Sequence, residues 1–384
     1  MRVMHIITRM IIGGAQENTL FNCLDLVREY GDEVLLVTGP QQGPEGGLLH
    51  AGRAGGLPIE TLDTLRRNIK PLTDFSAYRD LKKIISNFRP DVVHTHSAKA
   101  GMVGRAAAWN SKVPVVVHTV HGAPFHRYQS VVARRFFIAC ERWAAKRCHH
   151  LISVADAMTE LMVSAGVAPR EKFTTIYSGM KVEPFQRARE FRSSARAELG
   201  IEDHCVVFGK IARLFALKGH EYLIDAAQRV VAQLPNCRIL LVGEGILRTE
   251  LERRIARKGL TKHVIFAGLV EPERIPYYLG AMDVLVHTSL REGLARTLPQ
   301  ALIAGLPVIS YDIDGAREVV LPAVTGVLLK PQAIDELSDA MLVLAADAQL
   351  RRRLGEEGAA RFTDQFRHET MTRRIRELYQ RLAE

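Results

Sequence analysis

The stretch VLVHTSLREGLARTLPQALIAGLPVIS, residues 284–310, decides the fold of this chain. It begins with an apolar run, passes through a polar loop into a helical pattern, and ends in a second apolar run. Pro299 fits the first turn of the helix, and Gly305-Leu306-Pro307 ends the helix before the second run. A strand, a helix and a strand in this order form a right-handed βαβ unit, so we expect a parallel sheet.

Apolar runs alternate with helical patterns along the rest of the chain as well. Many of the runs are rich in Val and Ile and do not alternate with polar residues, which is typical of parallel strands buried on both faces. The fold class is therefore α/β with parallel sheets. We expect helices at residues 16–30, 78–87, 221–233 and 246–258, and strands at residues 3–7, 34–38, 92–94, 113–119, 151–154, 206–211, 238–242, 264–266, 284–288 and 308–310.

The pattern of strand, loop and helix at residues 1–20 starts again at residues 206–227, which indicates two similar domains. A length of 384 residues also suits two or three domains of about 150 residues. Between the two patterns lies SGMKVEPF, residues 178–185, followed by a polar stretch. We expect two Rossmann-like domains that face a cleft, at residues 1–182 and 183–355, and an Arg-rich amphipathic tail of one or two helices at residues 356–384.

The composition, with 47% apolar and 24% charged residues, is that of an ordinary globular protein. It excludes a mainly disordered chain, a collagen-like fibre and a coiled-coil rod. No window of the sequence holds 18 consecutive apolar residues, which a membrane-spanning helix needs. Because the apolar run at residues 3–7 is too short for a signal peptide, we expect a cytoplasmic protein.

The net charge of +10 indicates an anionic partner, such as a membrane surface, a phosphorylated substrate or nucleic acid. No known nucleic-acid-binding module accompanies the basic residues, which argues against nucleic acid. None of the five cysteines belongs to a CxxC pair, and the adjacent residues Cys148-His149-His150 cannot readily close a tetrahedral metal site alone. We therefore expect reduced thiols and no metal.

Two loops have the features of a phosphate site. In IGGAQE, residues 12–17, Gly13 and Gly14 follow the first strand and let backbone N–H groups approach an anion at a helix N-terminus. In GKIARLFALKG, residues 209–219, Arg213 and Lys218 lie between a strand and a helix. Two cations at the carboxyl end of a strand suit a diphosphate. A tight turn is the alternative for the first loop, and a solvated basic loop for the second.

The polar loop of the fold-deciding stretch adds candidate groups for a sugar. The carboxylate of Glu292 can accept hydrogen bonds from hydroxyl groups. The backbone N–H groups of Gly293, Leu294 and Ala295 precede a helix and can meet an anion or a polyol.

Together these segments resemble the retaining glycosyltransferases of family 4, which have the two-domain GT-B fold. The resemblance covers nearly the whole chain. It implies that a nucleotide sugar binds the second domain, that an acceptor binds the first, and that the last helix crosses back to the first domain. It rests on the Gly13-Gly14 loop, the Arg213/Lys218 loop, the segment from Glu292 to Gln300, and the sequences DVVHTH at residues 91–96, HTVHG at 118–122, GEG at 243–245 and GLPV at 305–308.

The resemblance also implies roles for single residues. His121 would reach the donor sugar and stabilise the reacting centre, with a strand-end cap as the alternative. Arg213, Lys218 and Glu292 would serve the reaction, and Gly243 would contribute to donor binding. We expect His94 and His96 to face different sides of their strand, with His96 and Lys99 contacting an acceptor.

The chain departs from the family at one position. The family usually has two glutamates with seven residues between them, and here these positions hold Glu292 and Gln300. The first carboxylate contacts the donor sugar in the family, and the second holds the ribose hydroxyls. Because Gln300 keeps an acceptor oxygen and adds N–H donors, we expect ribose binding to survive with weaker charge-assisted bonds.

The sequence Asp312-Ile313-Asp314 matches the DxD pattern that binds a metal in a different glycosyltransferase fold. Two carboxylates alone make a poor magnesium site, and the resemblance implies that no metal is needed. We therefore expect metal-independent chemistry and no cofactor.

The segment RYQSVVARRFFIACERWAAKR, residues 127–147, holds six Lys or Arg and one acidic residue. A basic amphipathic helix with aromatic residues is typical of binding to an anionic membrane surface. The alternative is an ordinary amphipathic helix whose apolar face lies in the core. The resemblance favours the membrane-binding interpretation of this segment, because family acceptors are often lipid-linked or cell-envelope glycans. The candidate membrane residues are Arg134, Arg135, Phe136, Phe137, Arg142 and Trp143.

The expected activity is that of a retaining hexosyltransferase. It would transfer sugar from a UDP-sugar or GDP-sugar to a glycan or lipid-linked acceptor in polysaccharide, lipopolysaccharide or glycolipid synthesis, on the inner face of the cytoplasmic membrane. Two alternatives stay open. A sugar-nucleotide epimerase of the same fold would need no acceptor, and a non-catalytic relative would only bind the nucleotide sugar.

Overall fold

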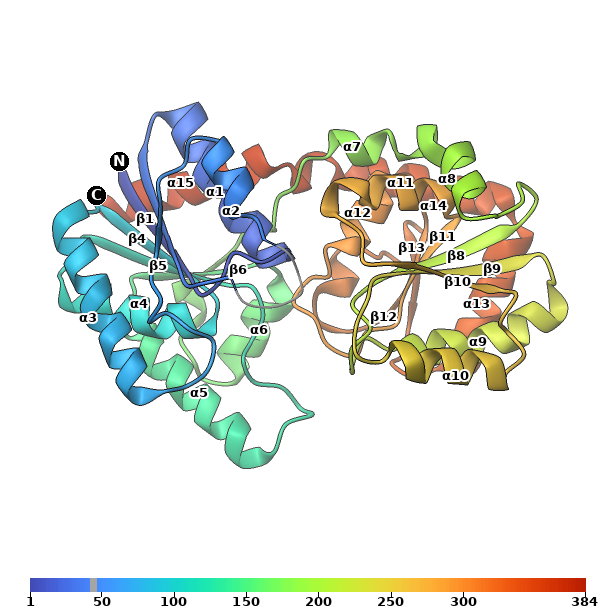
Figure 1. Cartoon of the computed structure of the whole chain (residues 1–384), viewed down its shortest axis with the longest axis horizontal. Helices are drawn as coiled ribbons and strands as arrows, with labels where there is room; N and C mark the ends of the chain where they lie inside the picture. Colours follow the sequence, from blue (N-terminus) through green and yellow to red (C-terminus); the bar gives the residue numbers. More distant parts are fainter. Residues whose placement is uncertain (42–46) are drawn as a thin grey trace. The chain divides into compact units, whose positions relative to one another are not determined.

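The computed structural model describes residues 1–41 and 47–384, which divide into two compact units (Figure 1). Unit 1 holds Met1–Met180 together with Gln365–Glu384, and unit 2 holds Lys181–Asp364. The first change of unit, after residue 180, lies close to the expected boundary after residue 182. Residues 356–364, which we expected in the returning tail, belong to unit 2 instead.

The described residues of unit 1 form a seven-stranded parallel sheet in the order β3-β2-β1-β4-β5-β6-β7. The direction in which strands are added reverses between β1 and β4. The strands are β1 (Arg2–Ile7), β2 (Glu33–Thr38), β3 (Ile59–Thr61), β4 (Val92–His96), β5 (Val115–Val120), β6 (His150–Ser153) and β7 (Phe173–Thr175). The helices are α1 (Gly14–Tyr30), α2 (Leu49–Ala54), α3 (Pro71–Phe88), α4 (Ala98–Asn110), α5 (Val131–Ala145), α6 (Asp156–Ser164), the short η1 (Arg170–Lys172), η5 (Asp364–Phe366), which spans the change of unit, and α15 (His368–Ala383).

The described residues of unit 2 form a six-stranded parallel sheet in the order β10-β9-β8-β11-β12-β13, which reverses between β8 and β11. The strands are β8 (Val206–Ile211), β9 (Cys237–Val242), β10 (Val264–Gly268), β11 (Val284–His287), β12 (Val308–Tyr311) and β13 (Gly326–Leu329). The helices are α7 (Glu183–Gln186), η2 (Ala188–Phe191), α8 (Arg192–Glu198), α9 (His220–Gln233), α10 (Arg248–Arg257), η3 (Pro272–Arg274), α11 (Ile275–Ala281), α12 (Thr297–Ile303), η4 (Asp314–Glu318), α13 (Ile334–Ala346) and α14 (Ala348–Phe362).

The α/β class and the parallel sheets expected from the sequence are confirmed, and each predicted strand overlaps a strand of the structure. Three strands were not predicted, namely β3, β7 and β13. They are short and lie at the edges of the sheets, where one side of the strand is unpaired. Such strands need not carry the continuous Val/Ile runs that mark a buried central strand.

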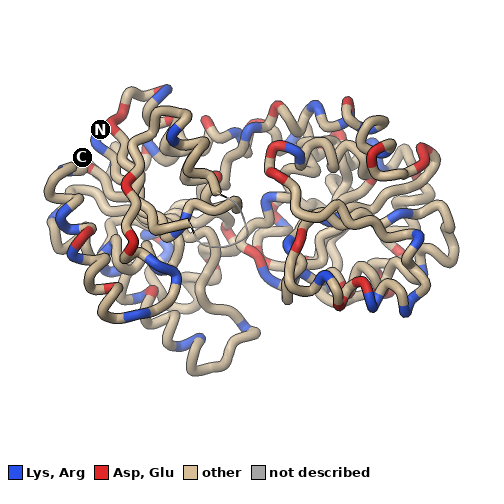
Figure 2. Tube along the Cα trace, viewed as in Figure 1, with Lys and Arg blue, Asp and Glu red and all other residues tan. Residues whose placement is uncertain are grey.

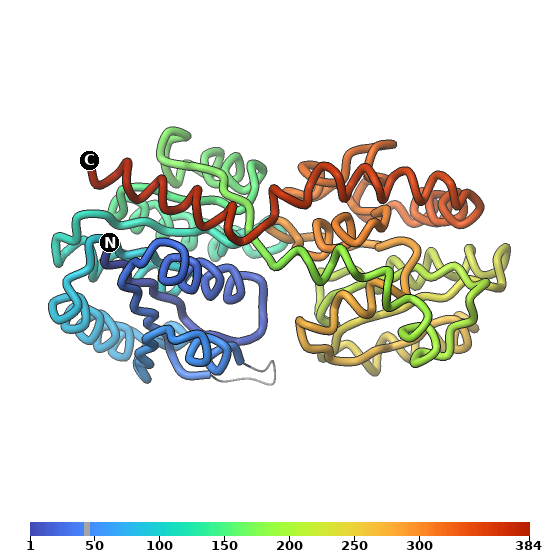
Figure 3. Tube along the Cα trace, turned by 90° about the horizontal axis from the view of Figure 1, so that it is seen from above, coloured from blue at the N-terminus to red at the C-terminus, as the bar shows by residue number. Residues whose placement is uncertain are grey.

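The C-terminal helix α15 packs against α1 in unit 1 (Figure 3). Its apolar side, which includes Met371, Ile375 and Tyr379, is buried with residues of β1 and α1 in one core cluster. Polar contacts fix the pairing, because the hydroxyl of Thr372 donates to Asp25 at 2.8 Å and accepts from the amide of Asn22 at 3.2 Å. The last helix thus completes the unit that the first strands begin.

Lys and Arg are spread over both units and interspersed with Asp and Glu (Figure 2). Among the described residues, no helix combines the length and the apolar character that crossing a bilayer requires.

Candidate active site

In unit 2, three of the predicted residues meet at one edge of the sheet. Ligands of open α/β sheets bind outside the carboxyl ends of the strands, at the point where the strand order reverses. In unit 2 this point lies between β8 and β11. The loop that follows β8 carries Arg213 and Lys218, and the loop that follows β11 carries Glu292.

Gly219 lets the two loops touch. Its φ is +69°, in the left-handed region, and a Cβ atom at this position would lie 1.9 Å from the carbonyl oxygen of Thr288. The Thr288 hydroxyl in turn donates to the Gly219 carbonyl at 2.6 Å. A side chain would therefore force apart the two segments that carry Lys218 and Glu292.

Lys218 and Glu292 form an ion pair between these loops. Their side chains are 22% and 23% exposed, so a ligand can reach both groups from solvent. Arg213 is exposed on the same loop as Lys218, with its guanidinium 5.0 Å from the centre of the Phe215 ring. The edge of the sheet thus offers two cations and one carboxylate.

Glu292 is ionised at any physiological pH. Burial alone would favour its neutral form, but the neighbouring His287 and Lys218 outweigh burial and lower the pKa of Glu292 to about 2. Burial lowers the pKa of His287, although the neighbouring Glu292 acts in the opposite direction. An ionised carboxylate at this place accepts hydrogen bonds from hydroxyl groups and holds the Lys218 ammonium in position.

Asp314 supports the Glu292 loop, and sequence reasoning missed this role. Its carboxylate accepts from the backbone N–H of Glu292 at 2.6 Å, and the N–H of Gly315 donates to the carbonyl of Gly293 at 3.0 Å. The other carboxylate of the DxD pattern, Asp312, pairs with Arg317. The two acidic residues therefore have separate protein partners.

Lys210 is a second residue that sequence reasoning missed. It lies on β8, is fully buried, and donates from Nζ to the hydroxyl of Thr288 at 3.1 Å. Burial, with repulsion from Lys218, lowers the pKa of Lys210 to about 7. The signal was present in the sequence, because a lysine interrupts the apolar run Val206–Ile211.

The remaining predicted donor residues of unit 2 are distributed around this edge. Gly243 has φ +138°, and a Cβ atom there would lie 2.2 Å from the carbonyl oxygen of Ala212, so glycine allows the loop after β9 to approach the loop after β8. Gln300 is half-buried within α12. Gly293, Leu294 and Ala295 are half-buried in the loop that precedes α12.

In unit 1, His121 is the outermost member of a chain of three imidazoles. Its Nε2 lies 3.1 Å from Nδ1 of His96, whose Nε2 lies 3.0 Å from Nδ1 of His5. His121 is half-buried, whereas His96 and His5 are fully buried. Burial lowers the pKa of His5 to about 3 and that of His96 well below its ordinary value, so both stay neutral.

The expectation that His94 and His96 face different sides of β4 is wrong. Residues two apart on a strand project from the same face, and the two ring centres are 4.2 Å apart. His96 is fully buried with both ring nitrogens occupied, so its predicted contact with an acceptor is not available in this structure. His94 bonds to Thr119 at 2.7 Å and to Tyr379 of α15 at 2.5 Å.

His5, His94 and His96 also place ligand atoms within 4.8 Å of one another, which raises the question of a metal. Nearly all of their nitrogens already have hydrogen-bond partners in these residues, Thr119, Tyr379 or His121. Of the ring nitrogens of these three histidines, only Nε2 of His5 has no partner among the described residues. The arrangement is therefore accounted for by hydrogen bonds between neutral rings.

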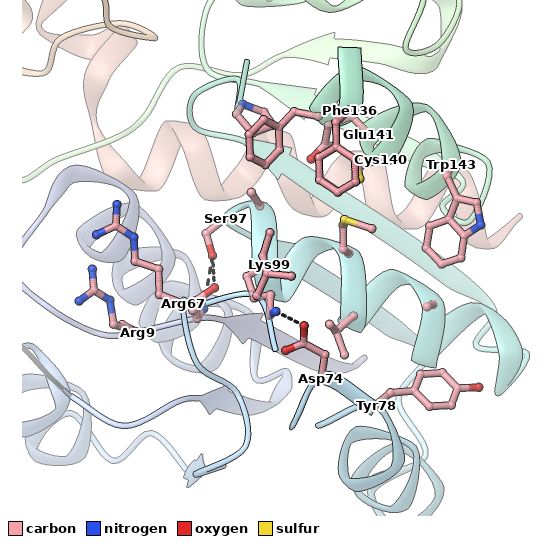
Figure 4. Close-up of a pocket in the computed structure, with 18 of the residues that line it drawn as sticks. Arg9, Arg67, Asp74, Tyr78, Ser97, Lys99, Phe136, Cys140, Glu141 and Trp143 are labelled. Atoms are coloured by element: carbon pink, nitrogen blue, oxygen red, sulfur yellow. Dashed lines mark hydrogen bonds and ion pairs between the residues drawn. The ribbon is translucent and has the colours of Figure 1, made fainter. Parts of the chain in front are cut away.

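Unit 1 contains a pocket of about 640 Å³ beside the reversal point of its own sheet. Thr8 and Ser97, which follow β1 and β4, line it, and their hydroxyls are 2.7 Å apart. Lys99 lines the same pocket and pairs with Asp74 (Figure 4). Gly13 and Gly14 lie at the start of α1, where Gly13 precedes the first helical residue.

Helix α5 presents aromatic residues outside the core. Only Glu141, Ala144 and Ala145 of this helix are buried, whereas Phe136 is 52% and Trp143 is 42% exposed. One face of α5 is therefore packed into unit 1 through Ala144 and Ala145, whereas Phe136 and Trp143 lie outside that face. Arg134 and Arg135 are exposed and Phe137 is half-buried, whereas Arg142 donates to the carbonyls of Gly166 and Ala165 at the end of α6.

Two family models match the chain. A model described as "Glycosyl transferase 4-like domain" matches residues 15–179, and one described as "Glycosyl transferases group 1" matches residues 191–361. The first match lies within unit 1 and the second within unit 2.

Curated relatives and solved structures agree with these matches. The UDP-Gal:α-D-GlcNAc-diphosphoundecaprenol α-1,3-galactosyltransferase of Escherichia coli is 30% identical over 75% of this chain and 74% of its own length. The capsular polysaccharide biosynthesis glycosyltransferase CapM of Staphylococcus aureus is 23% identical over 86% of this chain and 89% of its own.

Among solved structures, Anabaena Alr3699/HepE in complex with UDP superposes with a TM-score of 0.84 at 23% identity, over 99% of this chain and 100% of that one. WaaG, a glycosyltransferase involved in lipopolysaccharide biosynthesis, superposes with a TM-score of 0.74 at 18% identity, over 98% of this chain and 99% of that one. These likenesses establish the fold. With the family models and the Escherichia coli relative, they show that the chain belongs to the GT4-like glycosyltransferases of the GT-B fold.

Proposed function

We propose that the chain is a retaining glycosyltransferase that transfers a sugar from a UDP-sugar or GDP-sugar to a glycan or lipid-linked acceptor. The observation that supports this most directly is the Lys218–Glu292 pair, beside Arg213, at the reversal point of unit 2. A nucleotide sugar presents a diphosphate next to a ring rich in hydroxyl groups. The two cations suit the diphosphate, and the ionised carboxylate suits the hydroxyls.

The proposed reaction needs no protein nucleophile and no metal. The bond between the anomeric carbon and the diphosphate oxygen breaks, and a bond to the acceptor oxygen forms on the same face of the sugar. The acceptor proton passes to the leaving diphosphate. Arg213 and Lys218 stabilise the negative charge that develops on the diphosphate as the bond breaks. His121 contacts the donor sugar and stabilises the reacting centre, as the family resemblance implies.

The process we propose is synthesis of cell-envelope polysaccharide, lipopolysaccharide or glycolipid on the inner face of the cytoplasmic membrane. The names of the Escherichia coli and Staphylococcus aureus relatives support an envelope role. The exposed side chains of Arg134, Arg135, Phe136 and Trp143 on α5 support a peripheral attachment to anionic lipid.

A thermal-shift screen followed by a transfer assay tests the proposal. A ligand at 100 times its dissociation constant stabilises the native state by about 2.7 kcal/mol. We expect UDP or GDP to raise the melting temperature, and the corresponding monophosphate to raise it much less. Incubation of a labelled nucleotide sugar should then label an acceptor. Conversion of the donor sugar without an acceptor would identify an epimerase instead, and binding without turnover would identify a non-catalytic relative.

A further inference from the structure

Three histidines of unit 1 form a continuous line of hydrogen bonds across neighbouring strands. His5 lies on β1 and His96 on β4, which pairs with β1, and His121 directly follows β5 on the other side of β4. The line joins Nδ1 of His5 to Nε2 of His96 at 3.0 Å, and Nδ1 of His96 to Nε2 of His121 at 3.1 Å. It therefore connects two fully buried imidazoles to the half-buried His121.

The orientation of the rings suits hydrogen bonds between imidazoles. An N–H group and the lone pair of a bare ring nitrogen both lie in the plane of the ring, so nearly parallel planes favour the bond. The planes of His5 and His96 are inclined by 14°, and those of His96 and His121 by 29°. His94 packs beside the line, with its ring centre 4.2 Å from that of His96, and hydroxyl groups of β5 and α15 hold its own nitrogens. His96 therefore has little freedom to turn away from either partner.

Only two orders of protons can connect the two buried rings to His121. Burial lowers the pKa of His5 to about 3 and that of His96 well below its ordinary value, so each neutral ring has one N–H donor and one bare nitrogen. In the outward order, His5 donates to His96 and His96 donates to His121. In the inward order, His121 donates to His96 and His96 donates to His5. The order therefore fixes whether Nε2 of His121 accepts or donates.

The inner end of the line favours the outward order. Nε2 of His5 is buried and has no hydrogen-bond partner among residues 1–41 and 47–384. The inward order would place an N–H group at this nitrogen, whereas the outward order leaves it bare. Buried N–H groups without an acceptor are rarer in proteins than buried acceptors without a donor. Apart from burial, the groups that lower the pKa of His96 are four other histidines, which offer no negative charge to reverse the order.

We infer that His96 and His5 are positioning residues, which hold His121 as the neutral tautomer with its proton on Nδ1. Nε2 of His121 then accepts from His96 and cannot take the proton of an acceptor hydroxyl. Any hydrogen bond that the ring donates to the donor sugar comes from Nδ1. The role of the sugar rests on the proposed function, in which the acceptor proton passes to the leaving diphosphate. The tautomer is a property of unit 1 that can be measured without substrate.

NMR of the whole chain, with ¹⁵N in its histidine rings, tests the tautomer directly. The ¹⁵N shift of an imidazole nitrogen depends on whether it carries a proton, and the signals lost in His121→Gln identify His121 among the 14 histidines. The spectrum is recorded at about pH 8, where an ordinary histidine is neutral. We expect a protonated Nδ1 and a bare Nε2 in His121. A proton on Nε2 of His121 would overturn the inference.

Two variants of equal size at His5 test whether the line controls the tautomer. His5→Asn retains an N–H donor toward His96 and should leave the proton of His121 on Nδ1. His5→Asp places a carboxylate acceptor there, which should draw the proton of His96 onto Nε2 and turn Nε2 of His121 into a donor. The same tautomer of His121 in both variants would contradict control through the line. If His5→Asp does not show cooperative thermal unfolding, the tautomer of the wild type still decides.

Steady-state kinetics with varied donor connects the tautomer to the reaction. His5→Asp should lower kcat at least roughly tenfold with a smaller change in the donor KM, and His5→Asn should lower kcat much less. A merely structural role of His5 would affect the two variants alike. Equal kcat in both variants, with the tautomer reversed in His5→Asp, would overturn the positioning role.

The outcomes separate this inference from the proposed function. If the proton lies on Nε2 of His121 and the chain still transfers sugar, the inference fails and the proposed function stands. If the proton lies on Nδ1 but no nucleotide sugar binds, the assigned tautomer stands and the proposed function fails.

Discussion

Lys218 and Glu292 form an ion pair across 74 residues of sequence. One follows β8 and the other follows β11, and the two strands are neighbours at the reversal point of their sheet. The two loops touch at Gly219 and Thr288, where the Thr288 hydroxyl donates to the Gly219 carbonyl. Because parallel strands direct their carboxyl ends to one edge, two residues that are far apart in the sequence meet at the place where open α/β sheets bind their ligands.

The cations of this site should determine nucleotide affinity. Arg213→Ala and Lys218→Ala should each weaken binding of the nucleoside diphosphate by about 1.5–3 kcal/mol, because each removes a charge-assisted contact. Calorimetry with UDP and GDP measures the loss. Arg257→Ala is the matched control, since Arg257 is exposed on α10 of the same unit. Unchanged affinity in both site variants would remove Arg213 and Lys218 from the diphosphate site.

Asp314 should affect donor binding indirectly, through its hydrogen bond to the backbone of Glu292. Asp314→Ala leaves the backbone N–H of Glu292 without its acceptor, which should weaken donor binding by about 1–3 kcal/mol. Asp314→Asn should weaken donor binding less than Asp314→Ala does. Asparagine keeps an oxygen acceptor and tolerates the left-handed backbone at φ 44°. Asp312→Ala is the control, and donor titration is the measurement. An equal loss in the Asp312 and Asp314 variants would contradict the supporting role.

His121 should act on turnover more than on substrate binding. His121→Ala should lower kcat by a larger factor than it raises the donor KM, if its contact with the sugar strengthens in the transition state. Steady-state kinetics with varied donor concentration separates the two effects. Wild-type turnover in this variant would leave His121 as a structural cap at the end of β5.

The sequence alone was sufficient to predict those site residues that directly follow a recognisable apolar strand. Arg213, Lys218 and Glu292 follow apolar strands, so their common edge could be predicted from the parallel topology. Asp314 was considered only as a metal ligand, because its bond to the Glu292 backbone depends on how a loop after β12 folds back. The error at His94 and His96 was one of geometry, since residues two apart on a strand share a face.

Lys210 should make stability rise with pH. Its folded-state pKa of about 7 lies below its ordinary value of 10.5, so the unfolded state binds more protons between these values. Unfolding free energy should therefore increase over that range, by up to about 1.4 kcal/mol per pH unit from this group. Lys210→Met should be more stable at pH 7, and its advantage should shrink toward pH 10. Thermal unfolding of both proteins at pH 7 and pH 9 measures the difference, and a constant difference would contradict a buried, weakly basic lysine.

Helix α5 should bind anionic membranes. Replacing the exposed Arg134 and Arg135 by Glu should reduce co-sedimentation with anionic vesicles and activity on a lipid acceptor. It should spare nucleotide binding, which we assign to unit 2. Binding by the wild type should weaken near 1 M salt, where screening falls to about 3 Å. Equal and salt-independent recovery with anionic and neutral vesicles would refute a membrane role for α5.

The stereochemistry of transfer tests the account most directly. A nucleotide α-sugar, identified in the donor screen, is incubated with the protein and a lipid-linked acceptor, and the anomeric proton of the new glycoside is observed by NMR. The account predicts a product with the α configuration of the donor, formed only when the acceptor is present and lost in Arg213→Ala/Lys218→Ala. A β-linked product, or isomerisation of the donor sugar without an acceptor, would contradict it.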